Sequence, residues 1–237
     1  MGKKRLGLLG YGRLGRLLAG HLADDFDWVI HDPAYTGGMF ASLPEAAACE
    51  IVVLAVPMSS MESVCRQLAS YLDKGQLLLD TCSIKMHPLE TMRRFLPAGV
   101  EVIGTHPLFG PDSARDGLRG HKVVLCPLTQ GRVAEVRGYL ENQGLRVIMA
   151  TPEEHDRAMA ETQCLFHLMA RTIQEMGLKT GEIATPGPER LYNDFGILQH
   201  DTRQLFEDMQ NLNPFAAEIR RRFIDTLLRL DSSLKPF

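Results

Sequence analysis

Short apolar runs alternate with stretches of helical periodicity over the first 150 residues of the chain. Continuous apolar or β-branched runs of this length are typical of parallel strands that are buried on both faces. The predicted strands are Leu6–Leu9, Trp28–His31, Ile51–Val56, Leu77–Leu79, Val100–Thr105, Lys122–Cys126 and Arg146–Ala150. Strands that alternate with helices in this way predict an α/β domain over residues 1–150, a Rossmann-type, doubly wound and mostly parallel sheet.

Residues 151–237 show helical patterns only. Thr151 fits an N-cap, Pro152 the first helical position and Glu154 the closing residue of a capping box, and the pattern then runs to Gly177. After a break rich in glycine and proline, two more helical stretches follow, Glu189–Met209 and Pro214–Leu230. Three helices with so little chain to cover them favour a small all-helical domain that forms a homodimer.

The first predicted strand leads into Gly10-Tyr11-Gly12-Arg13-Leu14-Gly15, and a helical pattern follows. This is G-x-G-x-x-G between a strand and a helix. The first glycine makes the turn, the second lets a pyrophosphate approach the backbone, and the third lets the helix pack on the strand. The helix N-terminus then attracts the phosphate charge. The loop therefore predicts a dinucleotide site.

The second predicted strand ends in Asp32, twenty residues after Gly12. A carboxylate there can accept hydrogen bonds from the adenosine ribose, and it repels the 2′-phosphate of NADP. The alternative is that Asp32 only caps the turn before Pro33. Together with the glycine loop, Asp32 predicts NAD as the cofactor in preference to NADP.

The stretch Gly104–Asp116 contains the residue with the strongest candidate chemistry, His106. It is expected just past a strand end, in an exposed position before the turn Pro107–Pro111, where ligands bind in an open α/β sheet. The plainer reading is a histidine that satisfies a loop carbonyl. Ser83 and Lys85 follow an earlier strand and are expected at the same edge of the sheet.

Composition and charge narrow the classes of molecule that the protein could bind. The net charge of −3 over 237 residues gives no excess of positive charge for nucleic acid or an anionic membrane. The five cysteines are spread singly without metal-ligand spacing, so we expect reduced thiols in a cytoplasmic protein and no metal site. Glycines and Arg13 interrupt the N-terminal apolar stretch too early for a signal peptide or membrane span.

Four motifs in this order resemble the prephenate/arogenate dehydrogenase family of tyrosine biosynthesis. They are the glycine loop, the strand end Ala55-Val56-Pro57, Ser83-Ile84-Lys85, and the stretch His106–Pro111 with the pattern His-Pro-x-Phe-Gly-Pro. The helical Gln163-x-x-x-His167 and the later Thr202-Arg203 also look like the family's substrate helices. The match is poorer over residues 181–192, and the chain is shorter at its C-terminal end than most members.

The resemblance implies oxidative decarboxylation of a cyclohexadienol, with NAD against the glycine loop, Asp32, Val56 and Pro57. His106 would take the proton of the ring hydroxyl, and Ser83 would orient that hydroxyl or the imidazole. Besides His106 and Ser83, the residues that would contact the substrate are Gln163, His167, Arg203 and Asp116. Arg203 would hold a carboxylate.

Prephenate carries a side-chain ketone where arogenate carries an ammonium. A carboxylate at Asp116 would complement the ammonium, but the adjacent Arg115 can neutralise it, or Asp116 can simply begin a turn. The substrate choice stays open, with a lean toward a prephenate-using or dual enzyme.

Two other functions remain open at this point. One is another two-domain NAD(P) oxidoreductase of the hydroxyacid or imine-reductase type. Those enzymes usually place a catalytic lysine or aspartate on the long helix, whereas the polar row here is Gln163, His167 and Arg171. The other is a non-catalytic, dinucleotide-sensing Rossmann protein, which has no need of His106 or Ser83.

Overall fold

The structure is a computed structural model that describes residues 2–234, apart from the side chains of Ile197 and Gln199. The chain divides into two compact units, Met1–His155 and Asp156–Phe237. The sequence predicts a domain boundary near residue 150, and the division observed here falls within a helix, α6 (Pro152–Met159).

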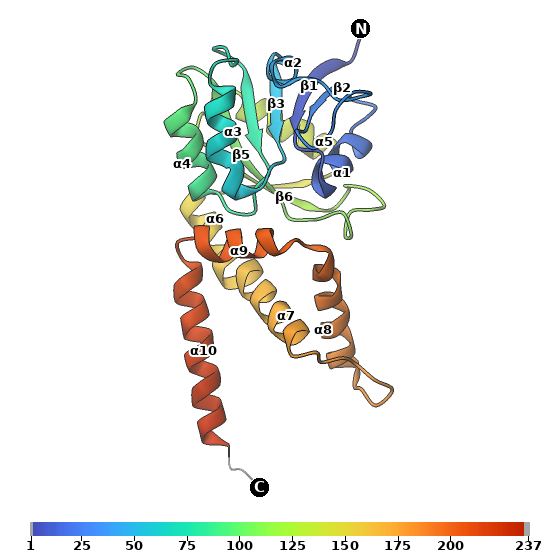
Figure 1. Cartoon of the computed structure of the whole chain (residues 1–237), viewed down its shortest axis with the longest axis vertical. Helices are drawn as coiled ribbons and strands as arrows, with labels where there is room; N and C mark the ends of the chain where they lie inside the picture. The colour runs from blue at the N-terminus through green and yellow to red at the C-terminus, as the bar shows by residue number, and fades with distance from the viewer. Residues whose placement is uncertain (1, 235–237) are drawn as a thin grey trace. The chain divides into compact units, whose positions relative to one another are not determined.

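The first unit is built on a seven-stranded sheet with the strand order β2-β1-β3-β4-β5-β6-β7 (Figure 1). Its strands are β1 (Lys4–Leu9), β2 (Phe26–His31), β3 (Ile51–Leu54), β4 (Leu77–Asp80), β5 (Glu101–Pro107), β6 (Lys122–Pro127) and β7 (Arg146–Met149). All neighbouring strands run parallel except β5 and β6, which pair antiparallel. This confirms the predicted α/β class.

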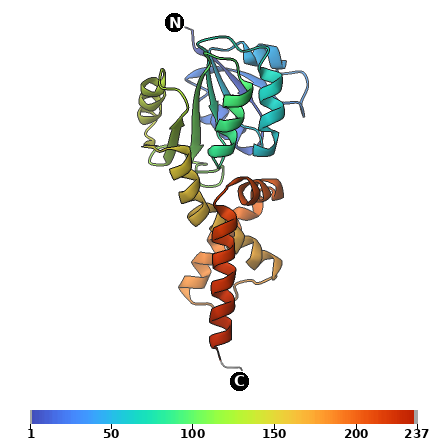
Figure 2. The ribbon, with the colours of Figure 1, turned by 90° about the vertical axis from the view of Figure 1, so that its left-hand side faces the viewer.

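Helices cover both faces of this sheet. They are α1 (Arg13–His21), α2 (Leu43–Ala47), α3 (Met61–Leu68), α4 (Met86–Phe95) and α5 (Val133–Asn142), with a 3₁₀ turn at Met58–Ser60. Helices α3 and α4 pack against each other on one face, where Figure 2 shows them side by side. A Cβ on Gly104 would touch Leu89 of α4, and one on Gly7 would touch the carbonyl of Ala46 in α2. Helices α2 and α4 therefore lie on this same face.

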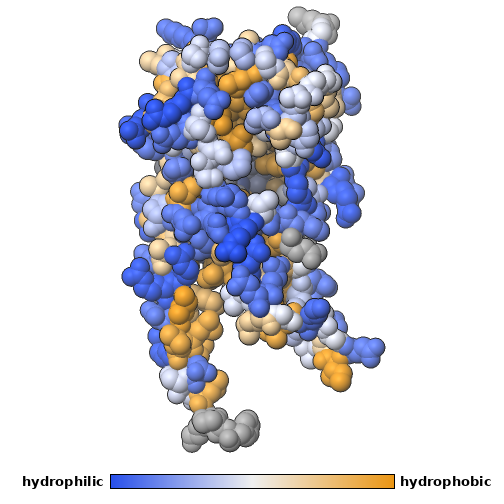
Figure 3. All heavy atoms as spheres, viewed as in Figure 1, coloured by the Kyte–Doolittle hydropathy of each residue, from blue (hydrophilic) through white to orange (hydrophobic). Residues whose placement is uncertain are grey.

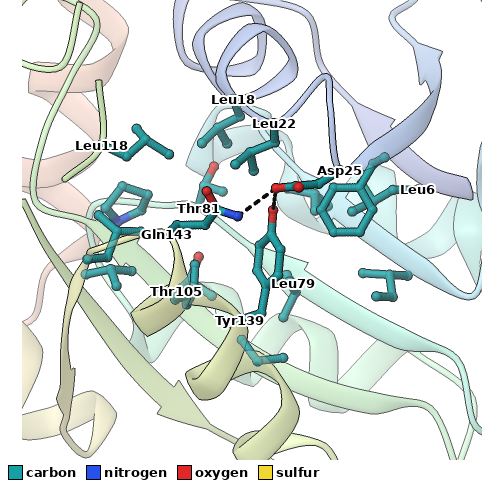
Figure 4. Close-up of a pocket in the computed structure, with 18 of the residues that line it drawn as sticks. Leu6, Leu18, Leu22, Asp25, Leu79, Thr81, Thr105, Leu118, Tyr139 and Gln143 are labelled. Atoms are coloured by element: carbon teal, nitrogen blue, oxygen red, sulfur yellow. Dashed lines mark hydrogen bonds between the residues drawn. The ribbon is translucent and has the colours of Figure 1, made fainter. Parts of the chain in front are cut away.

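The opposite face of the sheet carries α1, α5 and an apolar cavity of about 450 Å³ between them. Figure 4 shows its wall, with Leu6 and Leu79 from the strands, Leu18 from α1, Leu22 just after this helix, and Tyr139 from α5. The Tyr139 hydroxyl donates to Asp25 Oδ2 at 2.8 Å, and the Gln143 amide donates to the same oxygen at 2.6 Å.

The second unit is helical. Helix α6 passes through a π-helical turn (Ala160–Cys164) into α7 (Leu165–Glu175). The remaining helices are α8 (Pro186–Ile197), α9 (Arg203–Leu212) and α10 (Ala216–Ser233), with a 3₁₀ turn at Leu198–His200.

The predicted single helix Glu189–Met209 is wrong, because the chain breaks between α8 and α9. Thr202 has extended backbone angles, and its hydroxyl accepts a hydrogen bond from the Leu205 amide as the N-cap of α9. Such a cap starts a new helix and so ends the earlier one. Buried polar contacts join the parts of this unit, because Gln210 donates to the Cys164 carbonyl and Asn213 to the Asp156 carbonyl.

None of the five cysteines forms a disulfide, and all five are buried. Among residues 2–234, the helices contain no segment that is long and apolar enough to span a membrane.

Candidate active site

The glycine loop leaves β1 in the geometry that its sequence predicts. Gly10 has φ +95°, and a Cβ there would lie 2.3 Å from the Ala55 carbonyl oxygen. A Cβ on Gly15 would lie 2.2 Å from the Gly10 carbonyl oxygen, so both positions require glycine. Above Gly12 there is open space, and the N-terminus of α1 has no side-chain cap. The loop therefore fits a pyrophosphate, as a dinucleotide cofactor requires.

Asp32 connects the glycine loop to the end of β2. One carboxylate oxygen accepts from the Tyr11 amide at 2.7 Å and the other from the Ala34 amide at 2.9 Å. The bond from the Ala34 amide caps the turn, and the bond from the Tyr11 amide joins Asp32 to the glycine loop. Because each carboxylate oxygen has a further lone pair, both can still accept from ribose hydroxyls.

Val56 and Pro57 follow β3 at the same edge, where Val56 lies beside Gly10. Arg13 begins α1 and pairs with Asp112 at 2.7 Å, and Leu14 follows it in the first turn of the helix. The carboxyl ends of the parallel strands β1 to β5 thus bring the predicted cofactor residues to one edge of the sheet.

His106 lies inside β5, not beyond it, and the expectation of an exposed side chain is wrong. His106 pairs with Val124 of β6 in the antiparallel ladder, and only 3% of its surface is exposed. Thr105 and Pro107 line the apolar cavity, so by the alternation of a strand His106 points to the opposite face. The cavity therefore does not contain the candidate base.

A second histidine completes the environment of His106. His106 Nδ1 lies 2.8 Å from Nε2 of His155, which is 2% exposed and sits in the first turns of α6. The two rings meet edge to face with centroids 5.0 Å apart. No hydrogen bond within the described part of the chain engages the other ring nitrogen, His106 Nε2.

A buried ion pair lies next to His106. Lys85 and Asp80 are both fully buried and paired with each other. The ammonium also donates to the Thr105 carbonyl at 2.7 Å, next to His106 in β5. The paired oxygen of Asp80 accepts in addition from the Cys82 amide at 2.9 Å. Lys85, the last residue of the Ser-x-Lys motif, thus ties β4, β5 and the start of α4 together.

Burial holds the pKa of His106 well below its usual range, and the nearby His155 and the charge of Lys85 lower it further. An imidazole with a lowered pKa is neutral at physiological pH. His106 is consequently a neutral ring with one nitrogen engaged by the protein and the other available, which is the state that a general base needs.

Other predicted residues have weaker support from the geometry. Ser83 is half-buried and makes no hydrogen bond with the described residues, so it does not bond the imidazole here. Asp116 is exposed in the segment between β5 and β6. Both stay predictions as substrate contacts.

In the second unit, Gln163 lies in the π-helical turn, and its side-chain oxygen is buried without a hydrogen-bond partner among the described residues. His167 is buried 3.9 Å from Asp201, and burial with the nearby Arg171 lowers its pKa to about 4. This row is therefore not a solvated face. Arg203 is exposed and paired with Glu207 at 2.7 Å. The roles of Gln163, His167 and Arg203 in binding substrate stay predictions.

Comparisons with known proteins agree with the four motifs. The family model described as "Prephenate dehydrogenase, nucleotide-binding domain" matches residues 38–149. A probable arogenate/prephenate dehydrogenase of Methanocaldococcus jannaschii is 32% identical over 197 residues, which cover 78% of this chain. The chain belongs to the prephenate/arogenate dehydrogenase family.

Further relatives of this family extend the likeness. A chloroplastic arogenate dehydrogenase of Arabidopsis thaliana is 28% identical over 90% of this chain. The match spans 44% of the first of these two relatives and 65% of the second. The structure of prephenate dehydrogenase from A. aeolicus, in complex with hydroxyphenyl propionate and NAD+, has the same fold, with a TM-score of 0.75, 20% identity and coverage of 98% of this chain and 91% of that one.

Sequence reasoning missed two residues beside the candidate base of this family member. His155 follows the predicted capping box, and its position in the first turns of a helix was the available signal. Asp80 directly follows the predicted strand Leu77–Leu79, and no sequence pattern links it to Lys85. No group of three or more possible metal ligands occurs among residues 2–234.

The Asp80 and Lys85 pair yields a stability prediction. Replacing Asp80→Asn leaves the Lys85 ammonium buried without its counter-charge, which is expected to lower the free energy of unfolding by about 3–5 kcal/mol. Urea unfolding followed by circular dichroism measures this loss. Asp73→Asn, an exposed position in the loop before β4, is the control and should change stability by less than about 0.5 kcal/mol. Equal stability of the two variants would contradict the assignment.

Proposed function

We propose that this chain catalyses the NAD-dependent oxidative decarboxylation of prephenate or arogenate, with His106 as the base. One observation carries the proposal, namely a buried imidazole with a lowered pKa, one nitrogen of which no described residue engages, on the same sheet edge as a loop that fits a pyrophosphate. Family membership supplies the reaction class, and the residues supply their roles.

The first unit would hold the cofactor. Gly12 leaves room for the pyrophosphate at the N-terminus of α1, and Arg13 and Leu14 lie in that first turn. Gly10 and Gly15 allow the close backbone packing that shapes the loop. Asp32 would accept from the adenosine ribose hydroxyls, which favours NAD over NADP. Bound NAD supplies the hydride acceptor.

His106 would act on the ring hydroxyl of the substrate. Its Nε2 accepts the hydroxyl proton as the C–H bond of the same carbon breaks, and the ring carboxylate then leaves as CO2 while the ring becomes aromatic. The proton returns to the phenolic oxygen, so the imidazole ends neutral. Correct placement and one proton transfer are what the protein contributes.

The second unit would contribute substrate contacts. The Gln163 oxygen, which has no partner within residues 2–234, can accept a hydrogen bond from substrate, and a neutral His167 can donate or accept one. Arg203 would bind a carboxylate by exchanging its partner Glu207. In the first unit, a carboxylate at Asp116 would favour the ammonium of arogenate. Because Asp116 and the adjacent Arg115 are both exposed, Arg115 can neutralise this charge, which supports the lean toward a prephenate-using or dual enzyme.

A homodimer formed through the second unit is part of this proposal. Ile224, Leu227 and Leu228 share one face of α10 and are 46%, 49% and 63% exposed. Figure 3 shows apolar residues gathered along this helix. A row of exposed leucine and isoleucine on a helix is typical of a buried subunit interface.

The test of the function is NADH formation at 340 nm with prephenate and arogenate offered separately. Wild type should oxidise at least one of them, and His106→Asn should lower kcat by about 10²–10⁴-fold, the range for loss of a general base. His121→Asn, in the segment before β6, is the matched control and should keep full activity. If wild type binds NAD and oxidises neither substrate, the proposed function is wrong.

Asp32→Ser is expected to move the cofactor preference toward NADP. The change removes the charge that repels the 2′-phosphate, so the ratio of kcat/KM for NADP to that for NAD should rise by about tenfold or more. Steady-state kinetics with both cofactors measure the ratio. Asp27→Ser, on the exposed side of the same strand, should leave it unchanged. An unchanged ratio for Asp32→Ser would show that this carboxylate only caps its turn.

Light scattering coupled to size exclusion tests the dimer. Wild type should elute at twice the chain mass of 26.4 kDa, and the double change Leu227→Glu with Leu228→Glu should give the monomer, because two carboxylates would be buried in the interface. Arg221→Glu, an exposed position on the same helix, should remain dimeric. A monomeric wild type would contradict the proposal.

A further inference from the structure

Two buried nitrogens face each other between β5 and α6. His106 Nδ1 and His155 Nε2 are 2.8 Å apart, and the two residues are 3% and 2% exposed. Two imidazole nitrogens at this distance share one hydrogen bond, in which one ring donates the proton and the other accepts it. The position of that proton decides what His106 can do at its other nitrogen.

The two arrangements have opposite chemical consequences. When His106 Nδ1 carries the proton, His155 Nε2 accepts it and His106 Nε2 has a free lone pair. When His155 Nε2 carries the proton, His106 Nδ1 must accept it, and the proton of neutral His106 then lies on Nε2. In the second arrangement His106 cannot take a proton from a substrate hydroxyl.

The surroundings of His106 favour its neutral form. The buried ammonium of Lys85 binds the Thr105 carbonyl beside His106, and its counter-charge is the carboxylate of Asp80. A further positive charge on His106 is therefore disfavoured first by burial, and then by His155 and Lys85. Ser83, the other residue that could orient the ring, makes no hydrogen bond to it.

The placement of His155 is fixed by the start of its own helix. The Thr151 hydroxyl and amide both donate to Glu154 at 2.8 Å, and the Glu154 amide donates back to the hydroxyl at 3.2 Å, which is a capping box. His155 is the next residue, and its amide donates to the Thr151 carbonyl. His155 Nε2 is thus carried on a helical turn whose start this capping box fixes.

We propose that His155 is a positioning residue that holds His106 as the Nδ1–H tautomer and so keeps Nε2 free to accept the substrate's hydroxyl proton. The inference rests on the proposed function for its catalytic consequence. Its structural core, the tautomer of His106, is independent of any substrate. After proton transfer, His106 still donates from Nδ1, so His155 also stabilises the transient imidazolium.

Long-range 1H–15N correlation spectra of the wild-type protein, labelled at histidine, test the tautomer directly. The His106 resonances, assigned by comparison with His106→Asn, should show a protonated Nδ1 and an unprotonated Nε2. A proton on Nε2 in the neutral wild type would overturn the inference. This measurement needs neither substrate nor turnover, so it gives a result even if the proposed function fails.

Two substitutions test the catalytic consequence. His155→Leu removes the acceptor at similar volume, and His155→Gln can return an oxygen to the position of Nε2. The leucine variant should lower kcat by about 10²-fold with KM changed by less than about threefold, and the glutamine variant should recover to within about tenfold of wild type. In the leucine variant the spectrum should show the proton of His106 on Nε2.

A leucine variant with wild-type kcat and an unchanged His106 tautomer would overturn the inference. Circular dichroism melting of each variant reports folding. If His155→Leu does not fold, the wild-type spectrum and the His155→Gln variant still test the inference. A His155→Gln variant with the wild-type His106 tautomer and activity supports the positioning role. A His155→Gln variant with the His106 proton on Nε2 opposes it. A wild type that oxidises neither substrate defeats the proposed function and leaves the tautomer test standing.

Discussion

Burying an imidazole at the end of a strand costs it the solvation of its charged form, and the candidate site is organised around that constraint. His106 stays neutral because burial, His155 and Lys85 all oppose its protonation. Lys85 can be buried beside it only because Asp80 and the Thr105 carbonyl satisfy the ammonium. The same contacts therefore lower the pKa of the base, satisfy the buried ion pair and join β4, β5 and α4.

The parts of this arrangement that depend on local pattern could be predicted from the sequence. The strand runs, the glycine loop and Asp32 follow from short-range periodicity and from backbone positions that only glycine tolerates, as at Gly10 and Gly15. His106 was recognised from its motif and misplaced, because Pro107 suggests a turn. The strand accepts this proline at its last residue, and the antiparallel return of β6 then buries the histidine.

Contacts between distant segments could not be predicted in this way. His106 and His155 are 49 residues apart, and no periodicity links them. The break between α8 and α9 depends on the Thr202 cap, which looks like any polar residue within a helical pattern. In the same manner, a helical wheel places Gln163 and His167 on one polar row, but only tertiary packing shows that this row is buried.

The pH dependence of kcat/KM in the wild type tests the central claim, that a neutral, buried His106 is the base. Because kcat/KM reports ionisations of the free enzyme, it should fall on the acid side as His106 gains a proton. The lowered pKa of His106 predicts that this fall occurs well below pH 6.5, the usual histidine value, with activity retained at pH 6.5. An acid limb centred at or above pH 6.5 would contradict the account, since it would require a base that is exposed or differently paired.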